Sequence, residues 1–174
     1  YVSHDAFLFS DSFFNNIGFG MNAEDIDAKR VIEAATFAAV HSDIMQLPEQ
    51  YETIVGERGV TLSGGQKQRI SIARALIKDP KVVVFDDCLS AVDAQTERNI
   101  LGYLNDFLRD RTTVIITHRI FSLFNFDKII VIDDGTIVEE GNHASLLQRK
   151  GVYFELYERQ QSEEKSSSVT PVAS

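Results

Sequence analysis

The chain has 174 residues, 44% of them hydrophobic and 25% charged, which is typical of one soluble globular domain with its own core. The formal net charge of −9 argues against sequence-independent nucleic-acid binding, which depends on a basic surface. The one cysteine, Cys88, excludes an internal disulfide framework and fits a reducing cytosol. No apolar run reaches the roughly 18 residues that a membrane-spanning helix needs.

The first third of the chain predicts helices and an aromatic segment. Tyr1 and Val2 look like the end of a strand, so we expect the chain to begin inside a domain. Residues 7–17 are rich in phenylalanine, which fits either core packing or a partner-binding surface. Residues 24–46 have apolar side chains at helical spacing and predict one or two helices, which end at Leu47 and Pro48.

The stretch Leu62–Arg69 predicts the start of a phosphate-binding helix. Ser63 is a favourable N-cap residue, and Gly64 and Gly65 let backbone amides approach an anion closely. The helix that follows, over residues 70–78, adds a partial positive charge at its N-terminus. It ends before Pro80, which cannot continue a helix. If the serine and the two glycines stood alone, without the motifs that follow them, the alternative interpretation would be a flexible turn.

Residues 82–87 predict a strand followed by two carboxylates. The apolar run Val82–Phe85 indicates a strand buried on both faces, as in a parallel sheet. Open α/β sheets bind ligands at the carboxyl ends of their strands. There Asp86 is suited to hold Mg²⁺ and Asp87 to orient or deprotonate a water molecule. The alternative interpretation of the two carboxylates is a solvated turn. Cys88 is expected to be a small apolar side chain that fills space.

The remaining elements alternate helix and strand. An amphipathic helix over residues 94–108 precedes a second buried strand at 114–117, and His118 follows at the same sheet edge as Asp86. Residues 128–133 and 136–139 predict a hairpin, because Asp-Gly is a strong turn signal. A helix capped by Asn142 and a last helix from residue 151 follow. Residues 162–174 are expected to be a disordered tail.

Four motifs, in this order and spacing, resemble those of the ATP-binding cassette (ABC) ATPases. Leu62–Arg69 resembles the signature motif, the pair Asp86 and Asp87 the Walker B motif, Ser90–Asp93 the D-loop, and Thr117–Arg119 the H-loop. The resemblance covers residues 1–160 and implies an α/β fold, a P-loop NTPase-like core with a helical subdomain. The stretch Val55–Gly59 resembles one typical of exporter-type members.

The resemblance implies a role for each motif, with ATP and Mg²⁺ as cofactors. Asp86 would bind Mg²⁺, Asp87 the attacking water, and His118 the γ-phosphate. The D-loop residues are Ser90 and Asp93. Four signature residues would contact the ATP of a second nucleotide-binding domain in a head-to-tail dimer: Ser63, Gly64, Gly65 and Gln66. The other implied partners are transmembrane domains, which would place this ATPase on the cytoplasmic face of a membrane. The aromatic segment 7–17 would border the groove that receives them.

The chain departs from the family pattern in three ways. The P-loop is missing, because no lysine follows a glycine, so we interpret residues 1–161 as the C-terminal two-thirds of the domain. Its expected parts are a helical subdomain at 11–80 and a catalytic core at 81–161. Ser3 and His4 stand where the Q-loop has proline and glutamine, and Asp87 stands where glutamate is usual.

These departures predict that the chain alone is inactive. They also predict that, in the full-length dimer, it forms the degenerate-site half of a heterodimeric exporter. A soluble ABC ATPase of DNA repair or translation is one alternative, although repair-type members insert long coiled coils that this chain lacks. A non-catalytic nucleotide-binding module that regulates dimerisation is the other.

Overall fold

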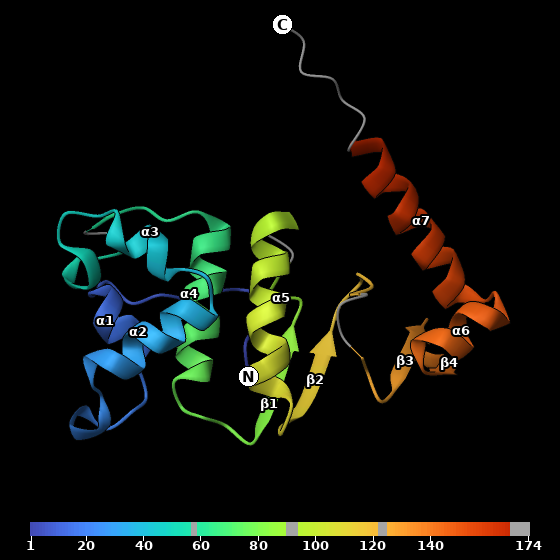
Figure 1. Ribbon diagram of the computed structural model, residues 1–174, viewed down its shortest axis with the longest axis horizontal. Coiled ribbons are helices and arrows are strands. Elements are labelled where there is room, and N and C mark those ends of the chain that lie inside the picture. Colours follow the sequence, from blue (N-terminus) through green and yellow to red (C-terminus); the bar gives the residue numbers. More distant parts are fainter. Residues whose placement is uncertain (57–58, 90–93, 122–124, 168–174) are drawn as a thin grey trace, which may run out of the picture. The chain divides into compact units, whose positions relative to one another are not determined.

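The computed structural model describes residues 1–56, 59–89, 94–121 and 125–167 (Figure 1). The chain divides into two compact units, residues 1–117 and 118–174, and each is described here by itself. The boundary between the two units follows the second strand, after residue 117. The predicted boundary between a helical subdomain and a catalytic core, after residue 80, is a different one and stays a prediction.

The helices of the first unit gather around α4. They are α1 (Phe13–Gly18), α2 (Ala28–Phe37), α3 (His41–Met45) and α4 (Gly64–Leu76), with short 3₁₀ turns at Ala23–Asp25 and Gln50–Glu52. Both α1 and α2 pack against α4 (Figure 1). The segment 24–46 forms two helices, as the sequence allowed, because Ala39 takes a left-handed backbone conformation (φ 54°) between them.

Helix α4 begins at Gly64, within the stretch Leu62–Arg69 where the sequence predicts the start of a helix. Ser63 caps the helix, as predicted, and both glycines lie in the first turn. At the other end α4 stops at Leu76. Asp79 then has a left-handed φ of 47°, and Pro80 follows it.

The sheet of the first unit has two parallel strands, β1 (Val82–Asp86) and β2 (Thr112–Ile116), joined through α5 (Ala94–Leu108). Val2 pairs with β1 as well, since its N–H donates to the Val84 carbonyl at 2.8 Å and its carbonyl accepts from Asp86 at 2.9 Å. The expected apolar face of α5 is confirmed as buried: Ile100, Leu101, Leu104 and Leu108.

The prediction that both strands are buried on both faces is wrong. Val83 and Phe85 are buried, but Val82, Val114 and Ile116 are 58%, 46% and 51% exposed. Successive side chains of a strand point to opposite faces. Within the described part of the first unit, one face of this sheet is therefore covered and the other is open.

The second unit is a hairpin followed by two helices. Strands β3 (Ile129–Asp133) and β4 (Thr136–Gly141) pair antiparallel, and the expected turn is confirmed, with positive φ at Asp134 and Gly135. Helix α6 (His143–Arg149) is capped by Asn142, as expected. Val131, Leu146 and Tyr153 form the small core.

Helix α7 (Val152–Ser167) shows that the start of the expected tail was misplaced. The helix continues through residues 162–167 because Glu163, Glu164 and Lys165 are good helix formers. The Ser162 hydroxyl also donates to the Glu158 carbonyl one turn earlier, at 2.8 Å. None of the helices in the described ranges is long and apolar enough to cross a membrane.

Candidate functional site

The N-terminus of α4 is capped by its own side chains. The Ser63 Oγ accepts from the Gln66 backbone N–H at 3.2 Å, and the Gln66 Oε1 accepts from the Ser63 N–H at 3.0 Å. This reciprocal capping box confirms Ser63 as the N-cap. Gly64 is exposed and Gly65 half-buried, so the positive end of the helix lies at the surface, where a phosphate can reach its amides.

The sequence analysis missed the structural role of Gln66. Its signal was nevertheless present, because Ser63 and Gln66 have the spacing of a capping box, a serine followed three positions later by glutamate or glutamine.

The two carboxylates lie at the carboxyl end of β1, as predicted. The Asp87 backbone N–H donates to the Ile116 carbonyl of β2 at 2.8 Å, and Asp87 has a left-handed φ of 46°, which aspartate tolerates better than most residues. The Asp86 Oδ2 accepts from the Tyr1 hydroxyl at 2.5 Å. This hydrogen bond raises the pKa of Tyr1, because ionisation would place a second negative charge beside the carboxylate.

His4 contacts the second carboxylate. Its Nδ1 lies 3.3 Å from the Asp87 Oδ2 and 3.4 Å from the Asp87 carbonyl oxygen, with the histidine side chain 57% and the aspartate side chain 22% exposed. The Gln68 side chain of α4 also approaches the His4 carbonyl, at 3.5 Å. The structure thus unites the Q-loop position with Asp87. The imidazole therefore lies in contact with one carboxylate oxygen of Asp87.

Asp86 and Asp87 can supply part of the ligands that Mg²⁺ needs. Carboxylate oxygens are suitable ligands for this hard cation, and Asp86 and Asp87 supply them at an accessible strand end. Within the described ranges, no group of three or more histidine, cysteine, aspartate or glutamate side chains could hold a metal ion. Protein sites often hold Mg²⁺ by one or two carboxylates together with substrate phosphates and water, which is the arrangement these residues allow.

Cys88 is buried beside the carboxylates, which confirms that it fills space. Burial is the main cause that raises the pKa of its thiol to about 12, and the charges of Asp87 and Asp86 add to it. A thiol with this pKa is not a nucleophile near neutral pH.

The remaining site residues stay predictions. His118 is exposed and begins the second unit, so its position relative to Asp86 and Asp87 stays a prediction. The D-loop residues Ser90 and Asp93 lie outside the described residues, as do Glu57 and Arg58 of the exporter-like stretch.

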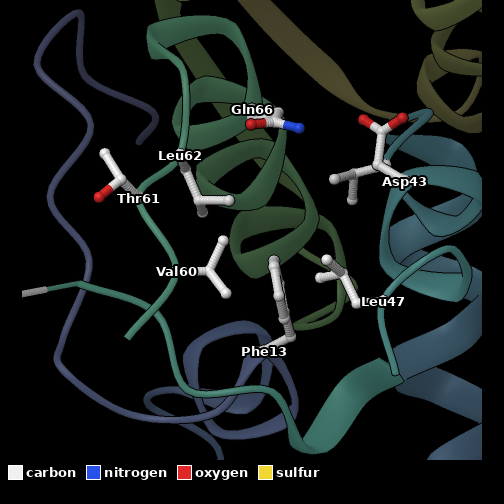
Figure 2. Close-up of a pocket in the computed structure, with 8 residues that line it drawn as sticks. Phe13, Asp43, Leu47, Val60, Thr61, Leu62 and Gln66 are labelled. Carbon is white, nitrogen blue, oxygen red and sulfur yellow. The ribbon is translucent and has the colours of Figure 1, made fainter. Parts of the chain in front are cut away.

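The sequence analysis also missed a pocket beside the signature. A cavity of about 100 Å³ lies between α3 and the segment that leads into α4 (Figure 2). Its lining is mainly apolar, and the polar side chains of Asp43, Gln66 and Thr61 complete it. The Asp43 carboxylate pairs with Arg69 of α4 at 2.5 Å, and Arg69 also donates to the Ala39 carbonyl. These contacts fix α4 to α3, but no local sequence pattern announces them.

Comparison with known proteins gives one consistent result. The family model described as ABC transporter matches residues 1–90. The multidrug resistance-like ATP-binding protein MdlA of Escherichia coli is 48% identical over 163 residues, which are 93% of this chain and 27% of that protein. Heavy metal tolerance factor 1 of Caenorhabditis elegans is 44% identical over 168 residues, 97% of this chain and 21% of that protein.

A solved structure agrees with these relatives. The bacterial Atm1-family ABC exporter with ATP bound superposes with a TM-score of 0.85 at 42% identity, and the match covers 92% of this chain and 28% of that one. The chain spans roughly a quarter of the length of the proteins that it matches.

Proposed function

Because this chain belongs to the ABC transporter family, we propose that it hydrolyses ATP within an exporter-type transporter and couples MgATP binding and hydrolysis to transport across a membrane. The observation that carries the proposal is the pair Asp86 and Asp87 at the carboxyl end of β1, in a chain whose α4 presents a capped, exposed N-terminus. Two transmembrane domains and a second nucleotide-binding domain are the proposed partners. This ATPase would then face the cytoplasm.

Each residue has one proposed task in the full dimer. Asp86 holds Mg²⁺, which when bound offsets the negative charge that develops on the phosphates. Asp87 orients the water, and His118 donates a hydrogen bond to the γ-phosphate. Ser63, Gly64 and the other signature residues receive the ATP of the facing domain through backbone amides. Ser90 and Asp93 complete the contact between the domains.

A change at Gly64 tests the signature. In the intact transporter, Gly64→Asp places a negative charge against phosphate, so we expect ATP still to bind but turnover at the facing site to stop. Gly102→Asp, on an exposed part of α5, is the control for added charge. Nucleotide retention and steady-state ATPase are the readouts. Unchanged ATPase in the Gly64 variant would refute the proposal.

The second part of the proposal is asymmetry between the two ATP sites. The Asp87 carboxylate is one methylene shorter than glutamate and falls roughly 1 Å short of the water, a displacement that can lower the rate about 10²-fold. The contact between His4 and Asp87 at 3.3 Å supports the same conclusion. We therefore assign this chain to a heterodimer in which its intact signature serves the competent site. The same contact favours the rival function, a nucleotide-binding module without catalysis.

Two variants separate these possibilities. Asp87→Glu in this chain and a glutamine in place of the partner's catalytic glutamate are compared by ATPase turnover. The asymmetric model expects the partner's change to abolish turnover and Asp87→Glu to have a small effect. A fully active homodimer of this subunit would contradict the asymmetric model, and an inactive wild-type dimer would support the non-catalytic module.

The 174-residue chain by itself should neither bind MgATP tightly nor hydrolyse it. The P-loop supplies most phosphate contacts in this family, and its pattern is not in this sequence. Titration calorimetry with MgATP would reveal micromolar binding if this expectation were wrong.

A further inference from the structure

The Gln160 side chain of α7 binds both polar backbone groups of Ile120. Its Oε1 accepts from the Ile120 N–H at 2.8 Å, and its Nε2 donates to the Ile120 carbonyl at 3.0 Å. The two residues are 40 positions apart, and Ile120 lies outside the helices and strands of the structure. A primary amide has both a donor and an acceptor, so Gln160 gives this irregular segment the partners that a neighbouring strand would supply.

Ile120 is also held through its side chain. The half-buried side chain packs against the small core of the second unit, whose members are Val131, Leu146 and Tyr153. Residues 118–121, called here the histidine segment, are therefore attached to the second unit at Ile120, while His118 at their start is exposed.

Helix α7 is itself anchored before it reaches Gln160. The Tyr153 N–H donates to the Glu139 Oε2 of β4 at 2.7 Å, and the Tyr153 hydroxyl lies 2.8 Å from the His143 Nδ1 of α6. The ring of Tyr157, one turn further along, lies 5.6 Å from the ring of His143. Because residues three apart are neighbours on a helix surface, Gln160 follows directly on this anchored side of α7.

The hydrogen bonds to Ile120 restrict where His118 can lie. The two residues are two positions apart, and consecutive Cα atoms are held about 3.8 Å apart, so a shift of Ile120 moves His118 with it. A displacement of about 1 Å in a reacting group can lower the rate about 10²-fold. The position of the Ile120 backbone therefore bears on any reaction that uses the imidazole of His118.

We infer that Gln160 is a positioning residue that holds His118 for ATP hydrolysis through the backbone of Ile120. The inference rests on the proposed function, in which His118 donates a hydrogen bond to the γ-phosphate. Glutamine suits this task because its amide accepts and donates at once. An ionised glutamate could accept from the Ile120 N–H, but it has no proton for the Ile120 carbonyl and would repel it.

The test replaces Gln160 by methionine in the intact transporter. Methionine has a similar length and a high helix propensity, but it makes neither hydrogen bond. Hydrogen–deuterium exchange of the histidine segment should become about fivefold faster or more, because the Ile120 N–H loses its acceptor. Maximal ATPase turnover should fall about tenfold, while the KM for ATP stays within about twofold of wild type, because the interaction lost is one made in the transition state.

Two controls separate positioning from general loss of structure. Glu158→Met places the same side chain at an exposed position of α7 and should leave exchange and turnover unchanged. Exchange of the hairpin, residues 129–141, should also be unchanged in Gln160→Met. Gln160→Glu is the second variant, which guards against misfolding, since it keeps the acceptor and loses the donor. It should lower turnover about threefold or more with the same unchanged KM.

The outcomes separate the inference from the proposed function. Unchanged exchange of the histidine segment in Gln160→Met, or faster exchange with full turnover, would overturn the inference alone. Faster exchange that spreads to the hairpin, or an equal loss of turnover in Glu158→Met, would do the same. A wild-type transporter that hydrolyses no ATP would overturn the proposed function, and the inference with it.

Discussion

The two ends of α4 are held by different kinds of contact. At the signature end, Ser63 and Gln66 cap one another and leave the glycines at the surface. At the other end, Arg30 of α2 donates to the Ile77 carbonyl, which follows α4, and Arg74 of α4 donates to the Asn16 carbonyl of α1. The end that binds a ligand must stay accessible, so a local capping motif holds its backbone in place. The opposite end is free to make the contacts that attach α4 to the rest of the unit.

Removal of the polar hub at the attached end should have the largest effect. We expect Asn16→Ala to lower the free energy of unfolding by about 3 kcal/mol, because it removes a buried amide that accepts from the Phe9 N–H and from Arg74 and donates to three backbone carbonyls. Urea unfolding of the intact domain measures this. The exposed neighbour Asn15, which donates to Asp11 at 2.8 Å, is the control, and Asn15→Ala should cost less than about 0.5 kcal/mol. Equal losses would contradict the comparison.

A middle-sized effect is expected where α4 joins α3. Asp43→Asn keeps the shape but removes the charge that pairs with Arg69, whose side chain is mostly buried. The free energy of unfolding should fall by about 1.5 kcal/mol. The exposed pair Lys29 and Glu33, 3.9 Å apart on α2, is the matched control, so Glu33→Gln should change stability by less than about 0.3 kcal/mol. A larger effect in the control would disprove the distinction.

The signature end should contribute less to stability than to function. Ser63→Ala loses the cap and should cost about 1 kcal/mol. Ser63→Asp restores a capping oxygen and a favourable charge at the helix N-terminus, so its stability should match wild type. Its carboxylate nevertheless repels phosphate, and ATPase of the transporter should fall. A Ser63→Asp variant with full turnover would show that the open end does not meet ATP.

The smallest effect concerns the packing beside the carboxylates. With the Cys88 pKa at about 12, the thiolate fraction at pH 8 is on the order of 10⁻⁴, so iodoacetamide should label Cys88 only after unfolding. The pKa is raised in the folded state, so this contribution to stability is present below pH 9 and is lost as pH rises toward 12. Cys88→Ala is the labelling control. Rapid labelling of the native domain would show that this edge is open.

Local patterns predicted those features whose physical cause is local. The periodicity of α5, the caps Ser63 and Asn142 and the hairpin turn at Asp134 each depend on a few neighbouring residues. Motif spacing also identified the carboxylates at the strand end. The signature motif lies at the N-terminus of α4, and the Walker B pair lies at the carboxyl end of β1. Both positions are the ones that the sequence predicts.

Contacts between residues that are far apart in the sequence could not be predicted from local patterns. His4 and Asp87 are 83 positions apart and Arg74 and Asn16 are 58 apart, so no spacing rule connects them. The burial of β1 and β2 was predicted wrongly for a related reason. An apolar run shows that a strand can be covered on both faces, but which face is covered depends on other parts of the chain.

The left-handed backbone of Asp87 limits which side chains this position accepts without strain. At φ 46° aspartate is among the residues best suited to the conformation, and glutamate is less so. A mutation from aspartate to glutamate would therefore gain length at a cost in backbone strain on the order of 1 kcal/mol.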